Sequence, residues 1–304
     1  MRNAVLHDLN QLPGITTSCA FDPRLPEPAI AHETVQIFGD DAWTTWQECI
    51  AQADAVLPIA PETNGALLSL TSAINDQGKI LLGCSEFAVS LTSSKLATSQ
   101  ILQAAGIRVV PTFKAEQYSE GWTGKWVAKP DDGVGCEGTI LFASQEELSS
   151  RWQEGNPKNH VVQPFLDGEP ASISMLCDKG RAWLLSCNRQ KVSIKAGTFI
   201  YHGSVLNGVA NHWIDFESLA QSIARAIPSL RGYVGVDVII HQGEITVLEI
   251  NPRFTTSYAG LNEAMGCNPA GLLIDLLYNS HLSPDGFRMP SELQRNKVDV
   301  CLDE

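Results

Sequence analysis

The 304-residue chain has no apolar segment long enough to cross a membrane as a helix. No uncharged apolar run reaches the ~18 residues that such a helix needs. The stretch from Met1 to Asn10 also lacks the basic segment and apolar run of a secretory signal peptide. These absences argue against a membrane partner and lead us to expect a cytoplasmic protein.

Paired cysteines are also missing. The eight cysteines are scattered singly, and no two form the C-x-x-C pair of a redox or zinc motif. A chain of this length that is 44% hydrophobic can bury a large core without disulfides. We therefore interpret the cysteines as reduced thiols. The histidines show no ligand spacing such as H-x-x-x-H, so no zinc site is expected.

Basic residues are scarce. The chain has 21 Lys and Arg against 34 Asp and Glu, a formal net charge of -13. Such a surface repels phosphate backbones, so we expect no nucleic-acid partner. A nucleotide is not excluded, because a few local lysines and helix ends can hold one. The oligomeric state stays open, with a homodimer among the assemblies that the sequence permits.

Helix-like and strand-like patterns alternate along most of the chain, which indicates an α/β fold with several parts. We predict an N-terminal α/β domain over residues 1–92 and a small subdomain over 93–166. A strand-rich C-terminal subdomain, which gives the fold an α+β character, follows over 167–304. Within it, 233–240 and 245–250 are expected to form a hairpin.

A glycine-rich loop separates the predicted strands 125–130 and 138–142. Gly133, Gly135 and Gly138 match G-x-G-x-x-G, a pattern with several interpretations. In a dinucleotide-binding fold the loop would open a helix, but a strand follows here. In a protein kinase the lysine strand follows the loop, whereas Lys129 precedes it. What remains is a flap that closes over phosphates beside Lys129, or an ordinary hairpin turn.

Two acidic residues, Asp131 and Asp132, begin this loop. Backbone N–H groups in such a loop attract anions, so neighbouring carboxylates are unexpected. A metal ion near bound phosphates would explain both, and this is our interpretation.

Polar side chains interrupt the predicted C-terminal hairpin. Asp237 lies in its first strand, and Glu249 and Asn251 lie in its second. A buried charge is costly unless it is paired or bound to a metal. An odd-numbered loop or a bulge would place Asp237 opposite Glu249, with Asn251 on the same face. Two carboxylates and an amide oxygen suit magnesium. The alternative is a buried ion pair between Arg253 and one of these carboxylates.

Lys95 precedes these residues in the chain, and the segment 163–169 lies between the glycine loop and the hairpin. Taken in order, all of these residues resemble the ATP-grasp superfamily of carboxylate–amine ligases. The resemblance covers about residues 80 to 265. It implies an ATP-grasp fold with a pre-ATP-grasp domain, a small lid subdomain and a C-terminal antiparallel-sheet subdomain. It also implies an enzyme that uses ATP and Mg²⁺ or Mn²⁺ to activate a carboxylate as an acyl phosphate and join it to an amine.

The resemblance implies a nucleotide site in the middle of the chain. Contacts with the ATP phosphates would come from Lys95, Lys129, Gly133, Gly135 and Gly138. The adenine-binding hinge would comprise Gln163, Phe165 and Leu166, and Glu169 would hold the ribose hydroxyls. Many relatives have an acidic residue where Gln163 stands, so this position departs from the family pattern.

The resemblance also implies a reaction site near the end of the chain. Asp237, Glu249 and Asn251 would hold the metal. Arg253 and Lys129 would be catalytic and would stabilise the transferred phosphoryl group or the acyl phosphate.

Shorter motifs, such as 59–63 and 199–203, resemble tyramine–glutamate ligases of methanofuran and one-carbon coenzyme biosynthesis. Their substrates are a small-molecule carboxylate and an amine. Candidate acceptor-site residues are Asn188, Arg189, Gln190 and Tyr201, together with His202. For the arginine and the aromatic residues, surface and packing roles are the alternatives. Two other functions stay open: a ligase that adds an amino acid to a peptide or pterin-linked acceptor, and an inactive ATP-binding regulatory protein.

Overall fold

A large antiparallel sheet forms the centre of this computed structural model, which describes residues 1–37, 41–115, 122–153, 159–279 and 287–302. The order of its strands is β13-β12-β9-β10-β11-β7-β6-β8-β5, and β14 pairs with β11. The strands are β5 (Phe113–Lys114), β6 (Trp126–Pro130), β7 (Ile140–Phe142), β8 (His160–Pro164), β9 (Glu169–Asp178), β10 (Arg181–Lys195), β11 (Thr198–Leu206), β12 (Gly232–His241), β13 (Glu244–Asn251) and β14 (Val298–Cys301). The predicted β12–β13 hairpin is confirmed.

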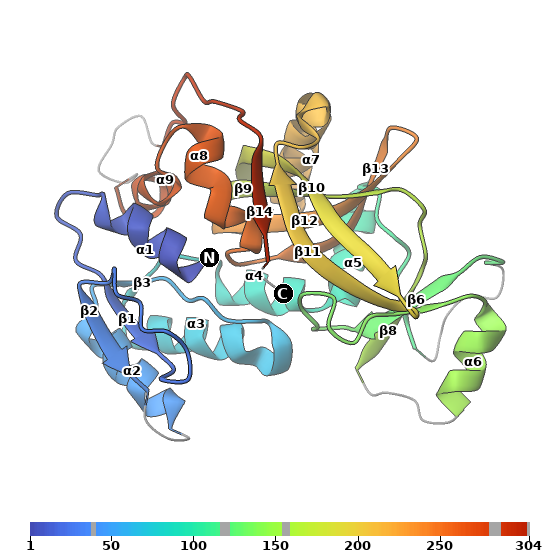
Figure 1. The fold of residues 1–304 in the computed structure, drawn as a ribbon, viewed down its shortest axis with the longest axis horizontal. Coiled ribbons are helices and arrows are strands. Elements are labelled where there is room, and N and C mark those ends of the chain that lie inside the picture. Colours follow the sequence, from blue (N-terminus) through green and yellow to red (C-terminus); the bar gives the residue numbers. More distant parts are fainter. Residues whose placement is uncertain (38–40, 116–121, 154–158, 280–286, 303–304) are drawn as a thin grey trace.

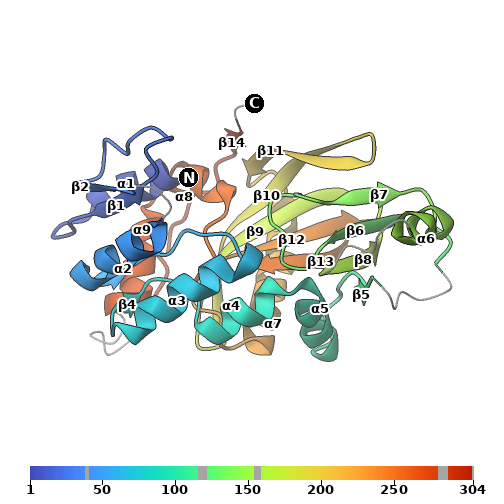
Figure 2. The same cartoon turned by 90° about the horizontal axis from the view of Figure 1, so that it is seen from below.

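Helices cover one face of this sheet (Figure 2). They are α4 (Glu86–Ser93), α5 (Lys95–Ala104) and α7 (Trp213–Ala226), beside α3 (Ala66–Asp76). Successive side chains of a strand point to opposite faces, so every second residue of β9 meets these helices. Ile173 and Met175 therefore pack with Phe216 and Ile223 of α7 in the main hydrophobic core. The other face of β9 is left free to line a cavity.

The N-terminal part shares a core with the C-terminal part. It contains α1 (Arg2–Asn10), the parallel pair β1 (Ser18–Phe21) and β2 (Glu33–Gln36), α2 (Ala42–Gln52), and the parallel pair β3 (Ala55–Val56) and β4 (Ile80–Leu81). In Figure 1 α1 lies beside α8 (Leu261–Met265) and α9 (Pro269–Ile274). Val5 and Leu82 belong to one apolar cluster with Phe254 and Leu273. This shared core fixes the N-terminal part against the rest of the chain.

A small lid lies at the other end of the molecule (Figure 1). It comprises β5 to β8 and α6 (Gln145–Gln153), and it has its own cluster around Trp126 and Phe142. The tip of the β10–β11 hairpin reaches it, since Leu141 N donates to Gly197 O at 2.7 Å. The lid thereby joins the central sheet and is held over one side of it. No helix in the described parts of the chain is both long enough and apolar enough to cross a membrane.

Candidate functional site

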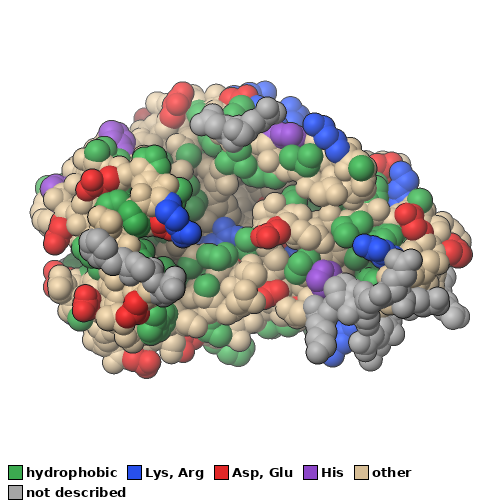
Figure 3. Space-filling model, turned by 60° about the horizontal axis from the view of Figure 1, so that its bottom comes forward, with side chains coloured by type: hydrophobic (Ala, Val, Ile, Leu, Met, Phe, Trp, Pro, Cys, Tyr) green, Lys and Arg blue, Asp and Glu red, His purple; other side chains and the backbone are tan. Residues whose placement is uncertain are grey.

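A cavity of about 440 Å³ opens between the lid and the central sheet, and Figure 3 shows a hollow in this face of the molecule. Its size is typical of a small-molecule site. The segments around it are β6, the loop 131–139, the β8–β9 connection, β10, β11, β12 and β13. The predicted site residues that line it are Lys95, Lys129, Gly133, Gly135, Gln163, Phe165, Leu166, Gln190, Tyr201, Asp237, Glu249, Asn251 and Arg253.

Asp237 and Glu249 lie opposite each other on β12 and β13. The register shifts between Asp237 and Val238, and this bulge places both carboxylates on the cavity side. A bulge is one of the two conditions under which the sequence predicts this arrangement. Asp237 accepts hydrogen bonds from Gln190 Nε2 at 2.8 Å and from Asn251 Nδ2 at 3.2 Å. Burial and the charge of Glu249 raise the pKa of Asp237 to about 7. This environment therefore favours an added cation.

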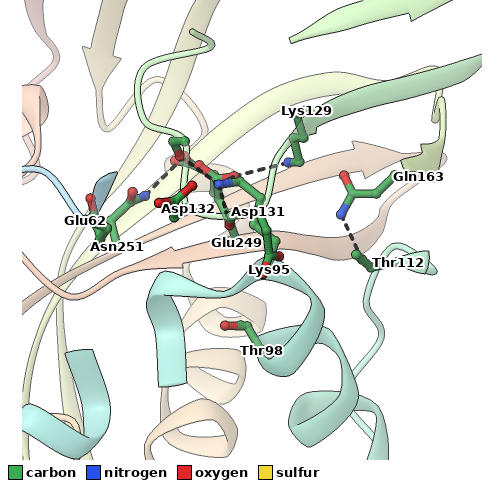
Figure 4. Close-up of polar contacts among 12 residues, drawn as sticks. Glu62, Lys95, Thr98, Thr112, Lys129, Asp131, Asp132, Gln163, Glu249 and Asn251 are labelled. Carbon is green, nitrogen blue, oxygen red and sulfur yellow. Dashed lines mark hydrogen bonds and ion pairs between the residues drawn. The ribbon is translucent and has the colours of Figure 1, made fainter. Parts of the chain in front are cut away.

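Two buried lysines converge on Glu249, as Figure 4 shows. Lys129 Nζ lies 3.1 Å and Lys95 Nζ 3.6 Å from Glu249 Oε2. Burial by itself opposes ionisation of Glu249, but the two ammonium groups outweigh it and lower the pKa of this carboxyl. Lysine and carboxylate charges thus lie side by side at one end of the cavity, the arrangement needed to hold a polyphosphate with its cation.

Arg253 pairs with neither of these carboxylates. Its Nε donates to Glu62 Oε2 at 2.7 Å, and Glu62 is 5% exposed. The alternative of a structural ion pair between Arg253 and Asp237 or Glu249 is therefore wrong. Glu62 was missed as a site residue, although it lies in the motif 59–63 that supported the tyramine–glutamate ligase resemblance.

The glycine loop is docked onto the protein through its acidic residues. Asp131 Oδ1 accepts from Leu96 N at 2.9 Å, at the first turn of α5. Asp132 Oδ2 accepts from Asn64 N at 3.0 Å, and its Oδ1 accepts from Asn159 Nδ2 at 2.8 Å. Each carboxylate satisfies backbone or amide N–H groups. These contacts account for both carboxylates without the metal ion that we had inferred.

Lys95 also holds this loop. Its Nζ donates to Gly133 O at 2.7 Å and to Asp131 O at 3.2 Å, in addition to its pairing with Glu249. Gly138, a predicted phosphate contact, does not line the cavity. Its φ is +66° and a Cβ there would lie 3.0 Å from Pro130, so glycine is required by the turn.

The predicted hinge also lines the cavity. Gln163 is buried, and its Nε2 donates to Thr112 Oγ1 at 2.8 Å (Figure 4). Phe165 packs against Phe199 of β11 with ring centroids 6.4 Å apart. With Leu166 they form a largely apolar wall that suits a flat aromatic base.

Two predicted contacts lie on the wrong face of the sheet. Glu169 and Arg189 form an ion pair with each other, and neither lines the cavity. Glu169 lies opposite Ile240, a residue of the helix-facing core. The physical reason is the two-residue period of a strand, because the neighbours Pro170 and Gln190 take the cavity side.

Of the remaining acceptor-site candidates, some line the cavity and others do not. Gln190 and Tyr201 line the cavity, and burial raises the pKa of Tyr201 to about 12. Asn188 is fully buried beside the cavity wall, where its Nδ2 donates to Ser172 Oγ and Ser174 Oγ. His202 contacts Ser193 through Nε2 at 2.7 Å and is not a lining residue. Asn188 and His202 therefore bond to neighbouring serines, and neither lines the cavity.

The residues at the carboxylate end fit a magnesium ion. No group of three or more His, Cys, Asp and Glu residues in the described ranges has metal-site geometry. The candidate set is instead Asp237, Glu249 and the amide of Asn251 on adjacent strands. Magnesium needs only one or two carboxylates from the protein when phosphate oxygens and waters complete its shell. The raised pKa of Asp237 agrees with this, because an added cation would relieve the repulsion from Glu249.

Comparison of the sequence with protein families gives two adjoining matches. Residues 92–257 match the ATP-grasp domain, and residues 15–89 match the pre ATP-grasp 3 domain. Tyramine–L-glutamate ligase of Methanocaldococcus jannaschii is 31% identical over 75% of this chain and 64% of its own length. The enzyme of the same name from Methanocaldococcus fervens is 31% identical over 68% of this chain and 61% of its own length. The chain thus spans less than two thirds of these relatives.

Solved structures share the fold. The biotin carboxylase–β,γ-ATP complex from Campylobacter jejuni matches with a TM-score of 0.74 and 14% identity, over 96% of this chain and 71% of that one. L-amino acid ligase from Bacillus licheniformis matches with a TM-score of 0.68 and 17% identity, over 89% of this chain and 69% of that one. With the family matches, these confirm the predicted pre-ATP-grasp and ATP-grasp architecture.

Proposed function

The chain belongs to the ATP-grasp family, and from this premise we propose that it is an ATP-dependent ligase joining a carboxylate to an amine through an acyl phosphate. One observation carries the proposal. Asp237 and Glu249 face each other on adjacent strands, and Glu249 contacts Lys129 at the flap end of a nucleotide-sized cavity. The partition into 1–92, 93–166 and 167–304 is part of the same proposal.

We place the adenine against the apolar wall of Phe165 and Leu166. The phosphates then point toward Lys129 and Gly133, where an ammonium group and flap backbone can meet their charge. Asp237, Glu249 and Asn251 would hold magnesium there, and the metal would supply further positive charge to the phosphates. Lys95, held by the flap and Glu249, lies within reach of the same charges.

The reaction transfers a phosphoryl group and then an acyl group. A carboxylate oxygen attacks the γ-phosphorus of ATP, the bond from that phosphorus to the bridging oxygen breaks, and ADP leaves. The amine nitrogen then attacks the acyl carbon, inorganic phosphate leaves, and the nitrogen loses a proton. Lys129 and Arg253 line the cavity where negative charge develops, so their part is electrostatic stabilisation. A docked flap excludes water that would hydrolyse the acyl phosphate.

The proposed substrates are L-glutamate, or an acid like it, and an aromatic amine such as tyramine or tyrosine. The names of the two archaeal relatives support this choice, as do Gln190 and Tyr201 beside Asp237 in the cavity wall. A role in synthesis of a one-carbon carrier coenzyme follows as part of the proposal, and so does a cytoplasmic location, where ATP is available and the eight unpaired cysteines would stay reduced. An amino acid joined to a peptide or pterin-linked acceptor is the second candidate.

A coupled assay tests the proposal. The protein is incubated with ATP, Mg²⁺, glutamate and tyramine, ADP and phosphate are measured, and the amide is identified by mass spectrometry. We expect one ADP for each amide formed, and no amide without Mg²⁺. ATP binding with no ADP formed across a panel of acids and amines would instead support a regulatory ATP-binding protein.

A further inference from the structure

One strand connects the two ends of the cavity. Leu166, at the proposed adenine end, lies just before β9, and Ser172 of β9 lies opposite Asp237 at the metal end. Pro170 faces the cavity between them, opposite Ile239, which also lines it. A nucleotide with its base at Leu166 and its phosphates level with Asp237 has its ribose beside Pro170.

The two described residues that form this part of the wall, Pro170 and Ile239, carry no side-chain group that can bind a hydroxyl. Pro170 and Ile239 have hydrocarbon side chains, and Pro170 has no backbone N–H. A Cβ at Gly168 would lie 2.5 Å from Ile239 Cγ2 and 2.6 Å from Ile240 O, so no larger residue fits there without a shift. Among the described residues that line the cavity, the acidic ones are Glu137 in the flap and Asp237 and Glu249 at the metal end.

Glu169 cannot turn inward to replace them. It faces the helix side and pairs with Arg189, and its ladder partner Ile240 is part of the main core. A one-residue slip of β9 that moved Glu169 to the cavity side would carry Ala171, which is fully buried, out of that core. The packing of this apolar side chain therefore holds the carboxylate on the far face.

We propose that this ligase does not recognise the 2′-hydroxyl of its nucleotide and accepts 2′-deoxyATP in place of ATP. The inference rests on the proposed function, because it requires the nucleotide to lie in this cavity. A hydrogen bond to a charged acceptor commonly changes affinity by roughly 10- to 150-fold. Without such an acceptor beside the ribose, removal of the hydroxyl has little effect.

The direct test is calorimetric. Dissociation constants of β,γ-imido-ATP and its 2′-deoxy analogue are measured with Mg²⁺ on the full chain, and turnover is compared with ATP and 2′-deoxyATP. We expect the two nucleotides to agree within about three-fold. A 2′-deoxy nucleotide that binds more weakly than this overturns the inference and leaves the proposed function standing. If neither nucleotide binds, the proposed function fails and this inference fails with it.

Variants at positions 169 and 170 test which side chain determines the preference between ATP and 2′-deoxyATP. Pro170→Glu places a carboxylate on the cavity side, and we expect it to favour ATP over 2′-deoxyATP by about ten-fold. The matched substitution Pro170→Ala should leave the ratio near one. Glu169→Gln should also leave it unchanged, since Glu169 faces the helix side. Should Glu169→Gln weaken ATP binding and spare 2′-deoxyATP, Glu169 holds the ribose and the inference is wrong.

Discussion

Glu62 and Arg253 form an ion pair across 191 positions of sequence, with Arg253 Nε 2.7 Å from Glu62 Oε2. Glu62 follows β3 in the N-terminal part, and Arg253 follows β13 and lines the cavity. Arg253 Nη1 donates to Phe254 O at 3.2 Å. The two contacts fix the plane of the guanidinium group, so the N-terminal part determines how Arg253 faces the bound substrates.

Replacement of this carboxylate should slow the chemical step. In Glu62→Gln the side chain keeps its shape and an acceptor oxygen, but Arg253 loses its counter-charge. We expect kcat to fall by roughly 10- to 100-fold, equivalent to about 1.4–2.7 kcal/mol, with KM for ATP within about three-fold. Steady-state kinetics measure this split. Glu48→Gln, an exposed change in the same part of the chain, is the control. A proportional change of KM for ATP would show that Glu62 acts on nucleotide binding instead.

Loss of the Glu249 charge should affect both activity and stability. Glu249→Gln leaves the ammonium groups of Lys95 and Lys129 buried without their shared partner. Breaking such a pair costs about 3–5 kcal/mol. We expect no measurable turnover and a lowered melting temperature, and ATP should restore part of the stability because its phosphates supply negative charge. Calorimetry and the coupled assay measure both effects.

The control for this variant is Glu244→Gln, at the exposed start of the same strand. It should melt and turn over like the wild type. Wild-type turnover in Glu249→Gln would contradict the proposed metal site.

The contacts of Asp132 predict that its replacement lets water hydrolyse part of the acyl phosphate. Asp132→Ala removes the acceptors for Asn64 N and Asn159 Nδ2 and so loosens the flap. We expect faster amide exchange over residues 133–138, and more ADP formed per amide, because water reaches the acyl phosphate. Hydrogen exchange and the ratio of ADP to amide measure these effects. Asp132→Asn keeps one acceptor oxygen and should lie between the wild type and Asp132→Ala. An unchanged ratio in both variants would refute a sealing role for Asp132.

Asp237 should make the stability of the metal-free protein depend on pH. Its pKa is raised from 3.8 to about 7 in the folded state, so the folded chain binds more protons than the unfolded chain between these values. Stability from this group is present at low pH and falls as pH rises toward 7. We expect Asp237→Asn to raise the melting temperature at pH 8 in a chelator and to change it little at pH 4. Thermal scans from pH 4 to 8 test this, and parallel curves for the two proteins would contradict it.

Local chemistry was enough to predict the elements that carry the site. Two apolar runs around a short turn predicted β12 and β13. An odd-numbered loop or a bulge was the condition for Asp237 to lie opposite Glu249, and a bulge is present. Ser94 precedes α5, a position where serine typically caps a helix, and its Oγ accepts from Ala97 N at 3.1 Å. These features depend on neighbours along the chain, so the sequence contains their cause.

Elements supported by distant partners were not predicted. β14 lies in a polar tail without clear periodicity, and it is a strand because β11 offers it an open edge. α1 has a weakly apolar sequence, but Asp8 accepts from Tyr258 Oη at 2.9 Å and from Asn262 Nδ2 at 2.6 Å. Both elements depend on partners that the linear pattern does not reveal.

The sequence by itself determined which chemical groups this protein can bring to a nucleotide and a metal ion, and the order in which they occur. Only the tertiary structure decided which of them face the cavity. Pro170 rather than Glu169 lines it, and Glu62 rather than Glu249 pairs with Arg253. The physical reason is that one residue of register reverses the direction of a strand side chain, and the core packing that sets this register joins segments far apart in the chain.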